Sequence, residues 1–177
     1  DILFDRFTNI IKYEKIKKDI GFKRNALVKM ATHKHIACMD SDDLYMPSYL
    51  KHSLDILLKN NLGLVCSPQM LFLYPHHDWK MTGIDCKDKR LGHEATMIFT
   101  KKYHKAMGGF IPKGTGEGVK LIEGMNEKYI GKSEIQFCML CIAHKDNSVP
   151  KDMFLDKGDM EYNLSEYDKT LIKDALN

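Results

Sequence analysis

Apolar positions along the chain follow two periods, which predict alternating helices and strands. One face of residues 23–32 is apolar at helical spacing, and a second helix is expected to open at Pro47 and end at Asn60. Residues 75–92 show no clear period and are expected to form a loop. Short apolar runs predict strands at residues 9–13, 35–39, 64–66, 70–74, 95–100 and 135–143.

Three further helices are expected in the second half of the chain. They are predicted at residues 101–107, from the end of the glycine-rich loop 114–118 to about Tyr129, and after Ser165, where Ser165 and Asp168 resemble a capping box. Helices that alternate with mostly apolar strands are typical of a parallel sheet covered on both faces. The pattern therefore predicts an α/β domain.

An acidic cluster, Asp40-Ser-Asp-Asp43, directly follows the strand predicted at residues 35–39. Ligands of parallel sheets bind beyond the carboxyl ends of the strands. Asp40 and Asp42 can reach one hard cation from the same turn, and such a cation can neutralise the phosphates of a nucleotide. The leading hypothesis is metal-assisted transfer from a nucleotide donor. The alternative is that these aspartates only cap the helix near Pro47.

The order of several motifs resembles the family 2 glycosyltransferases. In that family a Gly-x-Lys-Arg-Asn-type helix precedes a strand that ends in an Asp-x-Asp motif. The residues that match are Gly21, Lys23, Arg24, Asn25, Asp40, Asp42 and Asp43. The resemblance continues through segments 92–100, 108–110, 114–117 and 144–148, so that it covers roughly residues 10–150.

The resemblance implies the GT-A fold, a Rossmann-like α/β arrangement with a mixed, mainly parallel sheet and helices on both faces. Family members usually begin with a strand, a helix and a second strand for which this sequence has no room. The resemblance thus implies an N-terminally truncated domain, with residues 1–150 as its core and residues 151–177 as a C-terminal helical extension of the same domain.

The activity implied by the resemblance is inverting transfer of a sugar from a UDP- or GDP-sugar to a hydroxyl of a glycan or protein acceptor. It requires Mn²⁺ or Mg²⁺, for which Asp40 and Asp42 are the expected ligands and His144 the expected third ligand. The resemblance places the nucleotide-sugar donor against Lys23, Arg24, Asn25 and Asp40. Arginine is suited to a diphosphate because it binds in a bidentate manner.

The catalytic base is expected to be a carboxylate that deprotonates the acceptor hydroxyl. The family usually carries a Glu-Asp pair after a glycine-rich loop, and here the pair reads Glu117-Gly118. Glu117 is therefore the candidate base. Two alternatives stay open: Glu123 reaches in from the next helix, or the chain does not catalyse. Glu117 could also serve only to stabilise the start of that helix.

Two other function classes remain as alternatives. The first is a non-catalytic domain of a larger protein that binds a nucleotide or glycan or acts as a scaffold. The second is a nucleic-acid module built on the basic residues between Lys12 and Arg24, but the neighbouring acidic cluster opposes it, so no nucleic acid is expected. A net charge of +3 with 29% charged residues describes an ordinary soluble surface.

Composition sets the expected compartment. No run of 18 apolar residues occurs and no signal-peptide pattern is found, so no membrane segment is expected. Five cysteines are expected to be free thiols of a reduced, cytoplasmic protein, with Cys138 and Cys141 in the core.

One histidine pair is a further candidate for metal binding. His76-His77-Asp78 offers metal-binding groups, but adjacent histidines seldom converge on one ion without a third partner. No separate metal site is therefore expected there.

Overall fold

The computed structural model describes residues 18–86, 92–122, 128–147, 149–158, 160–162 and 165–176. Within this part the helices are α1 (Ile20–Met30), α2 (Tyr49–Lys59), α3 (Lys101–Ala106), α4 (Val119–Ile122) and α5 (Glu166–Leu176). The strands are β1 (His35–Ala37), β2 (Leu44–Tyr45), β3 (Leu64–Cys66), β4 (Gln69–Tyr74), β5 (Lys80–Asp85), β6 (Ile98–Thr100), β7 (Ile130–Lys132), β8 (Met139–Ile142) and β9 (Met160–Tyr162). Short 3₁₀ helices are η2 (Glu94–Thr96), η3 (Ile135–Phe137) and η4 (Lys151–Phe154).

The described strands form two mixed sheets, which agrees with the predicted α/β class. One has the order β1-β6-β3-β7 and the other β2-β8-β4-β5-β9. Only the β3–β7 and β4–β8 pairs are parallel among the described strands, so the expectation of a mainly parallel sheet is wrong there. The reason lies partly in the short β4–β5 connection, because a hairpin can join only antiparallel strands.

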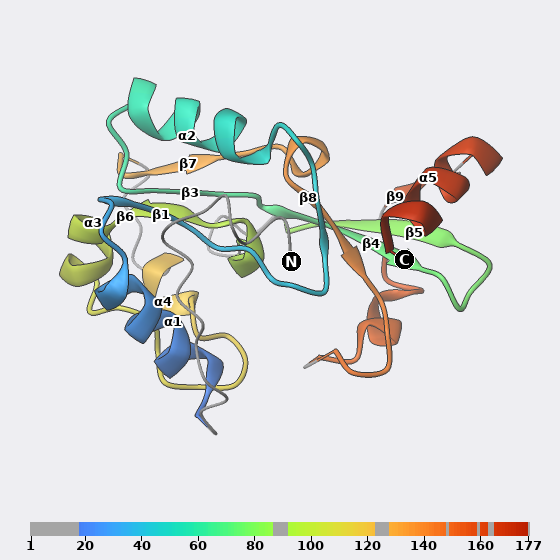
Figure 1. The fold of residues 1–177 in the computed structure, drawn as a ribbon, viewed down its shortest axis with the longest axis horizontal. Coiled ribbons are helices and arrows are strands. Elements are labelled where there is room, and N and C mark those ends of the chain that lie inside the picture. The colour runs from blue at the N-terminus through green and yellow to red at the C-terminus, as the bar shows by residue number, and fades with distance from the viewer. Residues whose placement is uncertain are drawn as a thin grey trace, which may run out of the picture.

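Helices cover the four-stranded sheet from both sides. In Figure 1, α2 lies above β3 and β7, whereas α1, α3 and α4 lie below them. The side chains of β3 alternate between the two layers: Val65 packs in the hydrophobic cluster that contains α2 residues, and Leu64 and Cys66 pack in the cluster that contains Val28 of α1. Burial on both faces explains the uninterrupted apolar sequence of this strand.

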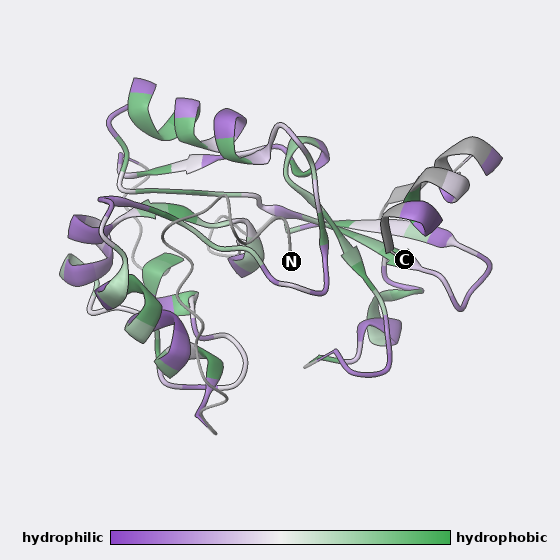
Figure 2. Ribbon diagram, viewed as in Figure 1, coloured by the Kyte–Doolittle hydropathy of each residue, from purple (hydrophilic) through white to green (hydrophobic). Residues whose placement is uncertain are grey.

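Apolar residues concentrate in the strands. Figure 2 shows hydrophobic colour along β4 and β8, while α1 and α2 alternate hydrophobic and polar turns. The four cysteines Cys38, Cys66, Cys138 and Cys141 are buried, and all five thiols are free, as predicted. Among the described residues, no helix has the length and apolar character needed to cross a membrane.

The loop predicted at residues 75–92 is wrong for residues 80–85, which form β5 and pair with β4 from Gln69↔Asp85 to Tyr74↔Lys80. Tight hairpin turns can usually be recognised from an Asn-Gly or Asp-Gly sequence, because the central residues of such a turn need positive φ. Here Asp78 and Trp79 adopt φ of 52° and 59° without a glycine. The sequence of this turn therefore does not indicate a hairpin.

Several other boundaries differ from expectation. Residues 94–96 and 135–137 form 3₁₀ helices, so the strands predicted at 95–100 and 135–143 are shorter. The helix expected to reach Tyr129 is described only to Ile122, and residues 128–129 form a turn before β7. The strand predicted at residues 9–13 lies outside the described residues, as do Lys12 and Glu123.

Candidate functional site

A cavity of about 680 Å³ lies beyond the end of β1. One wall is α1 with Lys23 and Arg24, and a second is the acidic turn 40–43. The opposite side consists of Glu94 and the loop that ends at Glu117. Ligand pockets in proteins commonly have volumes of about 300–1,000 Å³, so this cavity has the size of a small-molecule site.

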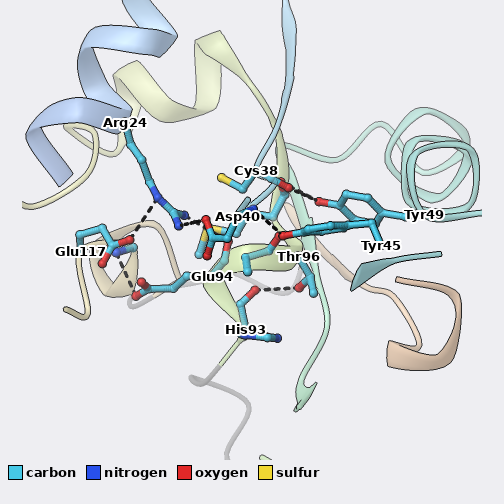
Figure 3. Close-up of polar contacts among 12 residues, drawn as sticks. Arg24, Cys38, Asp40, Tyr45, Tyr49, His93, Glu94, Thr96 and Glu117 are labelled. Carbon is cyan, nitrogen blue, oxygen red and sulfur yellow. Dashed lines mark hydrogen bonds and ion pairs between the residues drawn. The ribbon is translucent and has the colours of Figure 1, made fainter. Parts of the chain in front are cut away.

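Two tyrosines hold the backbone before the acidic turn. Asp40 N donates to the Tyr45 hydroxyl at 2.8 Å, and this hydroxyl donates to Ala95 O at 3.1 Å. The Tyr49 hydroxyl donates to Cys38 O at 2.9 Å, as Figure 3 shows. Tyr49 is fully buried at the start of α2. Its hydrogen bond therefore attaches the backbone before the acidic turn to the core.

Arg24 connects the two acidic sides of the cavity. Its Nη2 lies 2.7 Å from Asp40 Oδ1 and its Nε lies 3.2 Å from Glu117 Oε1. Figure 3 shows the side chain descending from α1 between these two carboxylates. A Cβ on Gly21 would overlap the carbonyl of Ile111, so only glycine lets α1 come close enough for this contact.

Glu94 and Glu117 form a carboxyl pair beside Arg24. Glu117 is only 3% exposed, and Glu94 Oε1 accepts a hydrogen bond from Gly118 N at 3.0 Å. Burial raises the pKa of Glu94 to about 7, and the neighbouring Glu117 adds to the shift. The Glu94 carboxyl can therefore gain or lose a proton near neutral pH.

Asp42 and His144 meet at the edge of the cavity. His144 Nε2 lies 3.1 Å from Asp42 Oδ2, and Asn147 Nδ2 donates to the same oxygen at 3.4 Å. Asp146 N donates to His144 Nδ1 at 3.2 Å, and Asn147 Nδ2 lies 2.7 Å from His144 Nε2, so both ring nitrogens have polar neighbours.

The predicted metal ligands come together in part. Within the described ranges, Asp40, Asp42 and His144 do not bring three ligand atoms within 4.8 Å of one another. Asp42 and His144 are adjacent, but Asp40 is turned toward Arg24. Burial raises the pKa of the Asp40 carboxyl, and Arg24 opposes part of this shift.

Asn25 and Asp43, two residues that carry the family resemblance, form hydrogen bonds with backbone groups of other segments. Asn25 Nδ2 donates to Phe110 O at 2.8 Å and Asn25 Oδ1 accepts from Phe110 N at 2.9 Å, so its amide clamps the segment after α3. Asp43 Oδ1 accepts from Ile142 N at 3.0 Å and attaches the acidic turn to β8. The donor contact expected of Asn25 stays a prediction.

Sequence reasoning did not assign Asn147, although it lies in the segment quoted for the resemblance. Its side-chain oxygen accepts from His144 N at 2.8 Å, so it orients the turn that carries the histidine. An asparagine three residues after a predicted ligand, in a polar turn, is the signal that was available. Glu94 lies in segment 92–100 of the resemblance, and the sequence alone assigns it no role.

Comparison with known proteins identifies the family of this chain. A search of the curated proteins finds no match to the chain. Residues 6–113, more than half of the sequence, match the family model described as glycosyl transferase family 2. The matched region includes Arg24, the acidic turn and Glu94, which form three sides of the cavity. The chain belongs to glycosyl transferase family 2.

Proposed function

We propose that this chain transfers a sugar, with inversion, from a UDP- or GDP-sugar to a hydroxyl of a glycan or protein acceptor, with Mn²⁺ or Mg²⁺ bound beside Asp42. The observation that carries the proposal is the cavity itself. An acidic turn and the Glu94–Glu117 carboxyl pair face each other across it, and Arg24 links them. Such a site has separate groups for the donor phosphates and for the acceptor proton.

Asp42 and His144 suit the proposed cation. Their facing atoms are 3.1 Å apart, which is close to the roughly 3 Å expected between neighbouring ligands of an octahedral ion bound at about 2.1 Å. Mg²⁺ commonly keeps several waters and needs only one or two carboxylates from the protein. When bound, the cation would neutralise the charge of the departing nucleoside diphosphate. Asp40 stays a predicted ligand.

Lys23 is the better candidate for direct contact with the donor phosphates. Arg24 already uses Nη2 and Nε to bind Asp40 and Glu117, so its main role would be to position these carboxylates. Lys23 lies half-buried in the wall of the same cavity. A lysine acts as a point charge on phosphate and does not need bidentate geometry.

The carboxyl pair is the proposed acceptor of the hydroxyl proton. Glu117 is the candidate base, and its Oε1 lies 3.2 Å from Arg24 Nε. Glu94, with a pKa of about 7, is the alternative base or the next carrier of the proton. Loss of the hydroxyl proton to either carboxylate would let the acceptor oxygen attack the sugar from the face opposite the leaving phosphate.

A second candidate function is a non-catalytic nucleotide- or glycan-binding domain. The observation that favours it is the Glu117-Gly118 sequence, which lacks the second carboxylate usual in the resembling enzymes. Turnover separates the two candidates. Hydrolysis of one nucleotide-sugar from a panel, reduced at least about 100-fold by Glu117→Gln with binding retained, would support the enzyme. Binding without turnover would favour the second candidate.

The first test is calorimetric titration of UDP and GDP with and without Mn²⁺. We expect metal-dependent binding that weakens at least about tenfold in Asp42→Asn, because the variant removes the proposed anionic ligand. Asp55→Asn is the matched control, since Asp55 forms an exposed ion pair with Lys51 on α2 at 2.7 Å. Equal binding with and without Mn²⁺, or equal binding by both variants, would refute the metal assignment.

A further inference from the structure

Two histidines and an aspartate cluster outside the cavity, where the β4–β5 turn meets η4. His76 Nε2 lies 2.8 Å from Asp152 Oδ1, and His77 Nε2 lies 3.8 Å from the same oxygen. One ligand atom from each of the three residues lies within 4.8 Å of the other two. The histidine pair lacked a third partner in the sequence, and the fold supplies Asp152 from 76 positions further along the chain.

We propose that His76, His77 and Asp152 form a second metal site, specific for Zn²⁺. Zinc binds imidazole nitrogen and carboxylate oxygen at about 2.0–2.2 Å in tetrahedral geometry, which places neighbouring ligand atoms about 3.3–3.5 Å apart. The two distances to Asp152 lie on either side of that value, so side-chain rotation within the cluster is enough to meet it. Three protein ligands leave the fourth position to water.

The turn explains how adjacent histidines face the same way. In a strand, successive side chains point to opposite faces, which would separate the two rings. Here the chain turns back: His77 N donates to Tyr74 O and Lys80 N donates to His77 O, both at 3.0 Å. The ring centroids of His76 and His77 are consequently only 4.5 Å apart.

One buried tyrosine positions both halves of the cluster. The Tyr74 side chain is fully buried, and its ring meets His76 and His77 edge-on at centroid distances of 6.3 Å and 6.2 Å. Its hydroxyl donates to the carbonyl of Lys151, the residue before Asp152, at 3.2 Å. Ligands held this way before binding lose little conformational freedom when the ion arrives.

The chemistry of the ligands separates this site from that of the proposed glycosyl transfer. Hard Mg²⁺ and Ca²⁺ prefer oxygen, whereas two imidazoles with one carboxylate suit zinc. The side chains are 42–61% exposed, so an ion can enter directly from solvent. Asp152 also lies beyond residues 6–113, the part matched by the family model. The inference is independent of the proposed function.

Zinc at this cluster would attach η4 to the β4–β5 hairpin. Lys151 and Phe154 of η4 line the large cavity, and Phe154 stacks on buried Phe72 at a centroid distance of 5.3 Å. An ion that joins the two segments would therefore restrain one wall of the cavity. Because the folded state holds the ligands together and the unfolded chain does not, bound zinc should raise the unfolding temperature.

The test is calorimetric titration of Zn²⁺ into the full chain with Mg²⁺ in excess, carried out in an Asp42→Asn background to remove binding near His144. We expect one zinc per chain, weakened at least about tenfold by His77→Ala and by Asp152→Asn. Exposed His33→Ala and Asp156→Asn are matched controls and should bind as the background does. Unchanged zinc binding in the His76→Ala/His77→Ala double variant would overturn the proposal.

Two readouts independent of these affinities complete the test. Co²⁺ substituted for zinc should give the intense visible absorption of a tetrahedral site, and Zn²⁺ should raise the unfolding temperature of the parent chain but not of His77→Ala. Tyr74→Phe keeps every ligand but loses the bond to Lys151, so it should weaken zinc binding without abolishing it. Absence of both the absorption and the temperature shift would also reject the site.

Discussion

Arg24 is the residue whose surroundings most restrict the site. Its side chain is 12% exposed and pairs with two carboxylates that approach from segments far apart in sequence. The ring of Phe110 lies 5.7 Å from its guanidinium carbon. A buried cation in this position holds charges that would otherwise repel each other, so its removal leaves Asp40 and Glu117 without compensation.

Arg24→Lys should therefore be destabilising although it keeps the charge. A lysine presents a single ammonium and cannot bind Asp40 and Glu117 through separate nitrogens of one planar group. We expect a loss of about 1–3 kcal/mol in the free energy of unfolding, measured by urea denaturation. Lys29→Arg, an exposed change on the same helix, should stay within about 0.5 kcal/mol of the parent chain. Equal stability of the two variants would contradict this account of Arg24.

At the scale of residues, the sequence predicted that Asp42 and His144 would lie close together. Asp42 and His144 are 102 positions apart, yet β2 and β8 pair antiparallel, so the segment before β2 meets the segment after β8. The resemblance supplied that pairing. It did not supply the direction of the Asp40 side chain, because the preference of Asp40 for Arg24 depends on burial in three dimensions.

At the scale of elements, the segment after α3 attaches to α1 through two adjacent glycines. Gly108 and Gly109 have φ of 79° and 75°, which side chains other than glycine rarely adopt. This turn brings Phe110 to the Asn25 amide, where both backbone groups of Phe110 form hydrogen bonds. His104 Nε2 also lies 2.9 Å from Asn25 Oδ1, so the contact joins α1, α3 and the following segment.

Gly109→Ala should disrupt this junction. The added methyl group would lie 2.7 Å from Asn25 Oδ1, and the backbone would be strained at positive φ. We expect a loss of about 1–3 kcal/mol in unfolding free energy, read from the denaturant midpoint at constant slope. The control is Gly114→Ala, where no atom lies within 4 Å of the added group, and this change should be close to neutral. An unchanged free energy of unfolding in Gly109→Ala would show that the junction adjusts to the methyl group without loss of stability.

Elements with regular apolar periods were the most predictable. The helix after Pro47 and the strand at residues 64–66 occur as expected, since one carries an apolar stripe and the other is apolar on both faces. Strand β5 was not predicted because Thr82 and Gly83 are buried in it although neither marks a hydrophobic face. Its existence depends on pairing with β4, which no local pattern expresses.

At the scale of the whole molecule, two adjacent residues in the cavity wall give stability opposite dependences on pH. Burial lowers the pKa of His93 from 6.5 to about 3, whereas burial and Glu117 raise the pKa of Glu94 from 4.5 to about 7. Between pH 3 and 6.5 the unfolded chain binds the proton of His93 more tightly, so stability rises with pH. Between pH 4.5 and 7 the folded chain binds the proton of Glu94 more tightly, so stability falls with pH.

Two variants should separate these effects when urea unfolding is followed from pH 3 to 8. Relative to His93→Leu, the parent chain should gain about 2–4 kcal/mol as pH rises from 3 to 6.5 and then level off, because the variant lacks the group that must stay neutral when buried. Relative to Glu94→Gln, it should lose about 1–2 kcal/mol between pH 4.5 and 7, less than the full pKa shift implies, since the half-buried carboxyl is partly solvated. The slopes should be opposite because the fold favours His93 without its ring proton and Glu94 with its carboxyl proton. Parallel curves for all three proteins would mean that neither residue keeps its proposed charge state in the fold.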